Sequence, residues 1–438
     1  MNPLALLPEL LVLTGGVAGL VTGLFVPRDR QRVVAWINGI ALVGAVAAVV
    51  AGPGGDFPAY ATDLVTDAAR VTVCVATLLL LWLAARHTGG NARETELYTL
   101  ISLAALGAIL MAGTADLLVL VAAYLLASIP AYALAGFAKD APGTEAALKY
   151  YLMGAFLGIC LLAGVTLAYG SSGATAYGQA RAPAVAAVLL LGGLLFKAGG
   201  VPAHFWVPDV AEGASRPVAA FVTTVPKVGA FAALYRLASE VFDEPALLAV
   251  IAAATMTLGN LAAFHQDNVR RLLAYSTVSQ AGYLLVPVAV AGRTGLAEPA
   301  LLFYLAAYAV TNAGAFAVVA AAGTDRLRDY AGLGRRAPWT AAALVVCLLG
   351  FVGTPPTAVF AAKVLMFAAA WDGGLAWLAV VAAVNTVASV FYYLRWIRPV
   401  FAGAADGPPP VGRGAVALVA AAVSLVLGVA AGAALLAA

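Results

Sequence analysis

Residues 189–210 read LLLGGLLFKAGGVPAHFWVPDV, an apolar run that carries one lysine and is then interrupted by glycine and proline. Residues 348–363 combine the same features in LLGFVGTPPTAVFAAK. Proline removes a backbone donor and glycine loosens the turn, so carbonyl groups are freed where lipid cannot satisfy them. Both stretches therefore predict broken helices that face protein or a wet cavity, with the breaks at Gly199, Gly200, Pro202, Gly353, Pro355 and Pro356.

Composition extends this interpretation to the whole chain. Of its 438 residues, 63% are hydrophobic and only 10% are charged, against about 25% charged residues in soluble domains. The sequence predicts an all-α polytopic membrane protein whose first span is a retained helix rather than a signal peptide. About fourteen helices are expected, at 4–26, 33–51, 68–86, 96–113, 115–138, 145–169, 183–206, 216–240, 246–265, 271–291, 298–322, 338–370, 374–397 and 413–436.

The distribution of charge predicts the orientation. Sixteen of the 24 Lys and Arg residues fall on one side of the predicted helices and four on the other, while four lie within apolar stretches. The positive-inside rule then places the side with sixteen in the cytoplasm and both termini on the outer side of the membrane. No basic run indicates nucleic acid, and the three cysteines lack the spacing of a metal or iron–sulfur site, so no metal is expected.

Four of the five lysines are the ones within apolar stretches: Lys149, Lys197, Lys227 and Lys363. A lysine at the centre of a membrane helix costs about 2.5–3.5 kcal/mol on insertion scales. Burial penalises the ammonium form, which lets such a side chain exchange protons with water or a neighbour. These lysines are therefore predicted to form a proton pathway; snorkelling or structural pairing is the alternative, and it is strongest for Lys149 near its helix start.

Two further residues are assigned to the proton pathway. Glu145 lies four residues before Lys149, a spacing that also stabilises a helix locally. His204 lies within the first break, where an imidazole could relay protons near neutral pH or serve a structural role.

The two predicted breaks occupy matching positions if helices four to eight and nine to thirteen form repeats. Five helices is an odd number, so the second repeat must be inverted relative to the first, and paired broken helices point to an ion pathway. The expected organisation is three N-terminal helices (1–95), a first five-helix bundle (96–245), an inverted second bundle (246–400), and a linker with a C-terminal helix (401–438).

Several runs carry a family resemblance, including VPAHFWVPDV at 201–210, RLLAYS at 271–276 and the pattern from Tyr304 to Phe316. They are similar to subunit N of NADH-quinone oxidoreductase, respiratory complex I, an antiporter-like membrane subunit. The resemblance implies proton translocation along buried lysines, coupled to quinone reduction elsewhere in the complex. It implies no cofactor in this chain, with NADH and quinone used by other subunits, and it implies antiporter-like and small membrane subunits as partners within the lipid bilayer.

The sequence departs from the family pattern at two positions. The glutamate that the family carries on the fifth helix, where it faces the lysine of the first broken helix, aligns with Leu125, and a histidine of the tenth helix aligns with Gln280. Without the carboxylate the lysine loses the partner that stabilises its charge. Two alternatives stay open: a subunit of a cation/proton antiporter or membrane hydrogenase, and a scaffold that has lost conduction.

Overall fold

The computed structural model describes residues 3–52, 57–90, 93–402, 412 and 414–437. All regular secondary structure in these residues is helical, and they contain no strand. Twelve of their helices are long and apolar enough to cross a membrane. The predicted all-α polytopic membrane fold is confirmed. Residues 53–56 of a predicted loop and residues 403–411 of the predicted linker lie outside the described residues.

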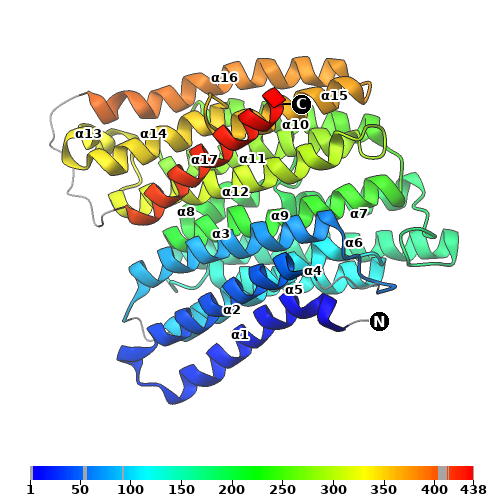
Figure 1. The fold of residues 1–438 in the computed structure, drawn as a ribbon, viewed down its shortest axis with the longest axis horizontal. Coiled ribbons are helices and arrows are strands. Elements are labelled where there is room, and N and C mark those ends of the chain that lie inside the picture. The colour runs from blue at the N-terminus through cyan, green and yellow to red at the C-terminus, as the bar shows by residue number, and fades with distance from the viewer. Residues whose placement is uncertain (1–2, 53–56, 91–92, 403–411, 413, 438) are drawn as a thin grey trace. The chain divides into compact units, whose positions relative to one another are not determined.

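The chain divides into two compact units, Met1–Ala198 with Gly213–Glu244, and Gly199–Glu212 with Pro245–Ala438 (Figure 1). The first unit contains η1 (Pro3–Leu6), α1 (Leu7–Phe25), η2 (Arg28–Arg30), α2 (Arg32–Ala51), α3 (Leu64–Thr88), α4 (Glu94–Gly113), α5 (Leu117–Ala135), α6 (Ala141–Ser172), α7 (Ala184–Ala198) and α9 (Arg216–Glu240). The second contains α8 (Trp206–Gly213), α10 (Pro245–Ala263), α11 (Val269–Ala289), α12 (Ala297–Ala322), η3 (Leu327–Tyr330), α13 (Leu333–Arg336), α14 (Pro338–Val352), α15 (Ala358–Asp372), α16 (Ala376–Phe401) and α17 (Ala415–Ala437).

Helix α4 is central to the packing of the first unit, where it contacts α1, α3, α5 and α9. A Cβ atom on Gly107 of α4 would overlap the backbone of Ala127 in α5, and one on Gly229 of α9 would overlap the carbonyl of Ala108. Small residues allow membrane helices to approach this closely, because lipid offers no hydrophobic force to drive them together. Helix α9 is enclosed as a result, although it carries a lysine.

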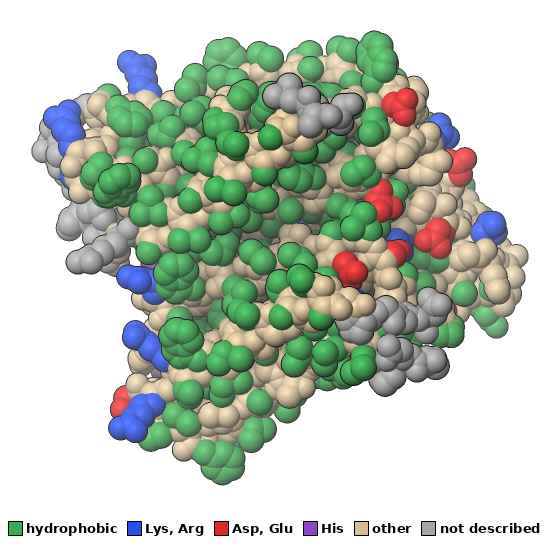
Figure 2. Space-filling view, viewed as in Figure 1, with side chains coloured by type: hydrophobic (Ala, Val, Ile, Leu, Met, Phe, Trp, Pro, Cys, Tyr) green, Lys and Arg blue, Asp and Glu red, His purple; other side chains and the backbone are tan. Residues whose placement is uncertain are grey.

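In the second unit α12 has the central position and packs against α11, α14, α15 and α17. Helix α16 instead presents a row of exposed apolar side chains, Val380, Val384, Val387 and Phe391, each at least 59% exposed. Figure 2 shows hydrophobic side chains covering the face along which α16 runs. A continuous apolar face of this size is suited to lipid hydrocarbon rather than water.

Two apolar helices end within the chain's hydrophobic stretches, as the glycine and proline pattern predicts. Helix α7 ends at Ala198, and Gly199 adopts a φ of 73° before helix resumes at Trp206. Helix α14 ends at Val352, and Gly353 adopts a φ of 85° before α15 begins at Ala358. Left-handed φ values of this kind favour glycine, which has no Cβ to clash.

Candidate functional site

Lys197 is the last residue but one of α7 and is completely buried in the first unit. Its ammonium nitrogen donates a weak hydrogen bond of 3.4 Å to the carbonyl of Ala127 on α5. No carboxylate forms an ion pair with it among the described residues. An ammonium in this position must therefore be stabilised by groups other than an acid.

Three tyrosine rings surround that ammonium and are called the tyrosine cage below. The nitrogen of Lys197 lies 5.2 Å from the ring centroid of Tyr124, 5.7 Å from that of Tyr132 and 6.0 Å from that of Tyr150. A cation within about 6 Å of an aromatic face is attracted by the ring quadrupole, by about 2 kcal/mol or more when desolvated. The cage can stabilise a charged lysine without adding a negative charge to the membrane interior.

The cage is held where α6 packs against both α5 and α7. The rings of Tyr132 and Tyr150 meet edge to face with centroids 4.7 Å apart, a favourable aromatic geometry. Gly154 on α6 leaves space for Tyr132, because a Cβ there would overlap the phenol. Ser128 donates a 2.6 Å hydrogen bond to the Tyr124 carbonyl one turn earlier on α5.

The expectation that position 125 faces Lys197 is wrong in this structure. Leu125 is 47% exposed, whereas its neighbour Tyr124 is 1% exposed and belongs to the tyrosine cage. Successive residues of a helix point about 100° apart, so only one of the two can face α7. Tyr124 thus occupies the place from which a carboxylate would contact the lysine.

Lys227 lies in the middle of α9 and is 1% exposed. Its ammonium nitrogen is buried with no hydrogen-bond partner among the described residues. It directly follows Pro226, whose missing N–H leaves the carbonyl one turn earlier without its helical donor. A buried amine without a partner is costly when charged, so this position suits a group that holds its proton only transiently.

Lys363 of α15 is 2% exposed and is held by the end of the second broken helix. Its ammonium nitrogen donates to the carbonyls of Phe351 at 3.1 Å and Val352 at 3.0 Å, and to the Thr386 hydroxyl at 3.2 Å. The ring centroid of Tyr283 is 4.3 Å away. The last carbonyls of a helix have no intrahelical donor and carry partial negative charge, so the broken end of α14 binds the cation directly.

Gln280 extends this second site. Its side-chain amide donates to the Phe351 carbonyl at 3.2 Å and accepts a 2.9 Å hydrogen bond from the Tyr304 hydroxyl. Lys363 and Gln280 thus share one backbone acceptor. A neutral amide at this position cannot titrate, so it orients the carbonyl without carrying a proton itself.

The remaining predicted pathway residues lie elsewhere. Lys149 and Glu145 pair at 2.8 Å on α6, with side chains 48% and 68% exposed, and so form a local pair on the outside of that helix. His204 is half-buried in the first break, and its Nδ1 atom is buried without a hydrogen-bond partner among the residues that the structure describes.

Two of the four arginines that the sequence places on the outer side, Arg70 and Arg236, are buried within helices. Arg70 of α3 is 4% exposed and donates to both carboxylate oxygens of Glu9 at 2.7 and 2.9 Å. Arg236 of α9 is 5% exposed and donates to the Ala112 carbonyl at 2.8 Å and to the Asp63 carboxylate. Their partners are distant in sequence, so only the spacing of Asp67 and Arg70 on one helix could have indicated such a pair.

Comparison with known proteins relates the chain to membrane subunits of NADH-quinone oxidoreductases. Residues 114–389 match the family described as "NADH:quinone oxidoreductase/Mrp antiporter, TM". The chain is 52% identical to NADH-quinone oxidoreductase subunit N 1 of Streptomyces griseus, over 98% of this chain and 96% of that one. It is also 52% identical to subunit N of a Mycobacterium species, over 99% and 97% of the two chains. A chain of respiratory complex I from Thermus thermophilus superposes with a TM-score of 0.88 at 34% identity, with 97% of each covered.

Proposed function

The chain belongs to the subunit N family of NADH-quinone oxidoreductases, within the NADH:quinone oxidoreductase/Mrp antiporter group, and on that premise we propose that it moves protons along its buried lysines. The membership favours an oxidoreductase complex over the cation/proton antiporter or membrane hydrogenase considered on sequence. Other membrane subunits of the complex are its partners, and quinone reduction by those subunits supplies the energy. NADH and quinone bind to them and not to this chain.

One observation carries the proposal. Lys197, Lys227 and Lys363 are each at most 2% exposed, and none has an ion-pair partner among the described residues. A structural charge would be expected to have a carboxylate, because an uncompensated buried ammonium is destabilising by several kcal/mol. An amine that gains and loses a proton avoids this cost for part of the cycle.

The sites around Lys197 and Lys363 stabilise the ammonium with different kinds of ligand. The tyrosine cage offers Lys197 the faces of aromatic rings, whereas the end of α14 offers Lys363 two carbonyls and a hydroxyl. All these groups are neutral, so each lysine can be neutral or charged without leaving a carboxylate unpaired. In this arrangement a change in the surrounding helices alters the stability of the ammonium and so releases or takes up its proton.

Orientation forms part of the same proposal. The excess of Lys and Arg on one side of the predicted helices puts that side in the bacterial cytoplasm and both termini outside. In Figure 2, Lys and Arg side chains gather at the end of the first unit where α1 joins α2, which is one of these cytoplasmic ends.

The test is NADH-driven proton uptake by the assembled complex in liposomes, measured together with NADH oxidation. Lys197→Ala, Lys227→Ala and Lys363→Ala should each lower the number of protons moved per NADH, while the complex still assembles. Lys149→Ala is the matched control, because its ammonium is half-exposed and paired on α6, and it should change the ratio little.

Two results would contradict the proposal. Unchanged proton uptake in all three variants would favour the scaffold alternative, in which the fold is kept and conduction is lost. Failure of all three variants to assemble, with Lys149→Ala normal, would show that the buried lysines are structural.

A further inference from the structure

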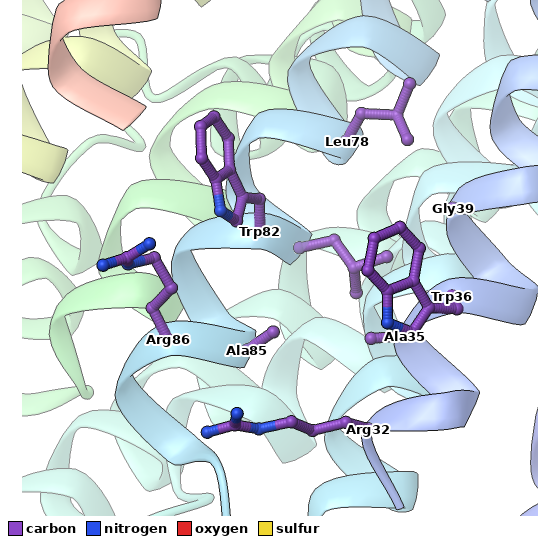
Figure 3. A pocket seen from close by; sticks show the side chains of 9 residues that line it. Arg32, Ala35, Trp36, Gly39, Leu78, Trp82, Ala85 and Arg86 are labelled. Carbon is purple, nitrogen blue, oxygen red and sulfur yellow. The ribbon is translucent and has the colours of Figure 1, made fainter. Parts of the chain in front are cut away.

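A groove lies on the first unit between α2 and α3 (Figure 3), and no lysine is among the residues that line it. Its volume is about 630 Å³. The residues that line it are Arg32, Ala35, Trp36, Gly39, Leu78, Leu81, Trp82, Ala85 and Arg86. None of them belongs to the proposed proton pathway, so the groove requires a separate explanation.

Two arginines mark one end of the groove. Arg32 is the first residue of α2 and Arg86 lies in the last turn of α3, so the connectivity brings both to the same membrane side, the one that the charge distribution assigns to the cytoplasm. Both are exposed, and neither makes a hydrogen bond or ion pair in the described part of the chain. Figure 3 shows both side chains at the groove. Two exposed guanidinium groups at the same end of a groove favour the binding of an anion there.

The remainder of the groove is apolar. It runs from Arg32 to Gly39 along α2, a separation of seven positions and so about 10 Å, or about one third of a hydrocarbon core. Gly39 lacks a side chain and so widens the groove opposite Leu78. The indoles of Trp36 and Trp82 are 72% and 40% exposed beside it, as is usual for tryptophan near a membrane interface.

We propose that this groove binds an anionic phospholipid of the cytoplasmic leaflet. The phosphate and its charged headgroup lie between Arg32 and Arg86, and one acyl chain lies in the apolar groove between α2 and α3. A free inorganic anion would use the arginines and leave the apolar part empty. A zwitterionic lipid would fill the groove but offset its phosphate with its own cation. Only a lipid of net negative charge complements both ends of the site.

The test is photolabelling of the assembled complex in vesicles of equal parts phosphatidylglycerol and phosphatidylcholine. A diazirine on the acyl chain is carried by one lipid or the other, and labelled peptides of α2 and α3 are quantified. Phosphatidylglycerol should label them more than phosphatidylcholine. Arg32→Gln with Arg86→Gln should reduce this preference by about fivefold per arginine, the contribution of one basic residue near a charged bilayer surface.

The control is Arg28→Gln with Arg30→Gln, which removes two arginines from the same end of the unit but outside the groove. It should leave the lipid preference unchanged. Equal labelling by both lipids would overturn the proposal, since the groove would then hold any acyl chain. An absence of label from both would also overturn it, because another subunit would then cover the groove. Competition by inorganic phosphate would overturn it in favour of a soluble anion.

Discussion

The ammonium nitrogen of Lys197 lies 5.2 Å from the ring centroid of Tyr124, and no acid replaces that ring within the described residues. A glutamate and a tyrosine stabilise an ammonium by different means, the first by full charge and the second by a quadrupole that acts over a shorter range. The distinction can be tested, because the hydroxyl of Tyr124 can be removed while its ring is kept.

Tyr124→Leu should lower the NADH-driven proton flux of the complex about thirtyfold, taking about 2 kcal/mol for one desolvated cation–π contact. Tyr124→Phe keeps the ring and should retain most of the flux. Tyr169→Leu is the matched control, since Tyr169 lies on α6 with 53% of its surface exposed. Equal losses in the Phe and Leu variants would mean that the hydroxyl, and not the ring, is required.

A carboxylate introduced on α5 should act on Lys197 only from the side that faces it. Tyr124→Glu should slow amine-selective modification of Lys197 in membranes at a given pH, because the carboxylate favours the unreactive ammonium. Leu125→Glu should leave the rate unchanged, since this position is 47% exposed. If Leu125→Glu slows modification instead, α5 is rotated in the working complex relative to this structure.

Two features of Gly353 favour glycine: its backbone conformation and its contact with Lys363. A comparison with Gly374 separates their effects. The φ of 85° at Gly353 is left-handed, and a Cβ there would lie 2.8 Å from Cδ of Lys363. Gly374 shares the left-handed φ, at 79°, but a Cβ there meets nothing within 4 Å. Both alanine variants should lose about 1–2 kcal/mol of stability in thermal unfolding. Only Gly353→Ala should also reduce proton flux, because only it displaces a lysine.

The ion pair between Asp63 and Arg236 should make the thermal stability of the protein depend on pH in the acidic range. Partial burial opposes ionisation of the Asp63 carboxyl, but the hydrogen bond and charge of Arg236 outweigh this and lower its pKa. A carboxyl with a lowered pKa contributes stability above its unfolded value of about 3.9 and loses that contribution as the pH falls through the folded value.

Asp63→Asn should therefore lower the thermal midpoint of the purified complex at pH 7, and the difference from the parent should shrink as the pH falls below about 4. In an Arg236→Gln background the same substitution should change the midpoint little, because the partner is already absent. A difference that persists unchanged at low pH would show that the carboxyl charge is not what stabilises the pair.

Orientation predicts which introduced cysteines react from outside the cell. A membrane-impermeant maleimide should label Ser172→Cys at the end of α6 and should not label Arg335→Cys in α13. The parent is a suitable background, because Cys74, Cys160 and Cys347 lie within apolar helices. Labelling of Arg335→Cys in intact cells would reverse the proposed orientation.

The sequence by itself determined the membrane class, the two interruptions and the three most buried lysines. Each depends on local composition: an apolar run long enough for a bilayer, a proline that cannot donate, or a lysine within an otherwise uncharged apolar stretch. The same local rules were insufficient for Lys149, since periodicity alone does not say which side of α6 meets another helix.

What surrounds each lysine was decided only by tertiary structure. Tyr124 and Tyr150 approach Lys197 from two other helices, and the Phe351 carbonyl reaches Lys363 across the second break. The assignment of Leu125 as the residue facing Lys197 failed for a related reason: a shift of one residue rotates a side chain by about 100°, and only packing of α5 against its neighbours sets that rotation.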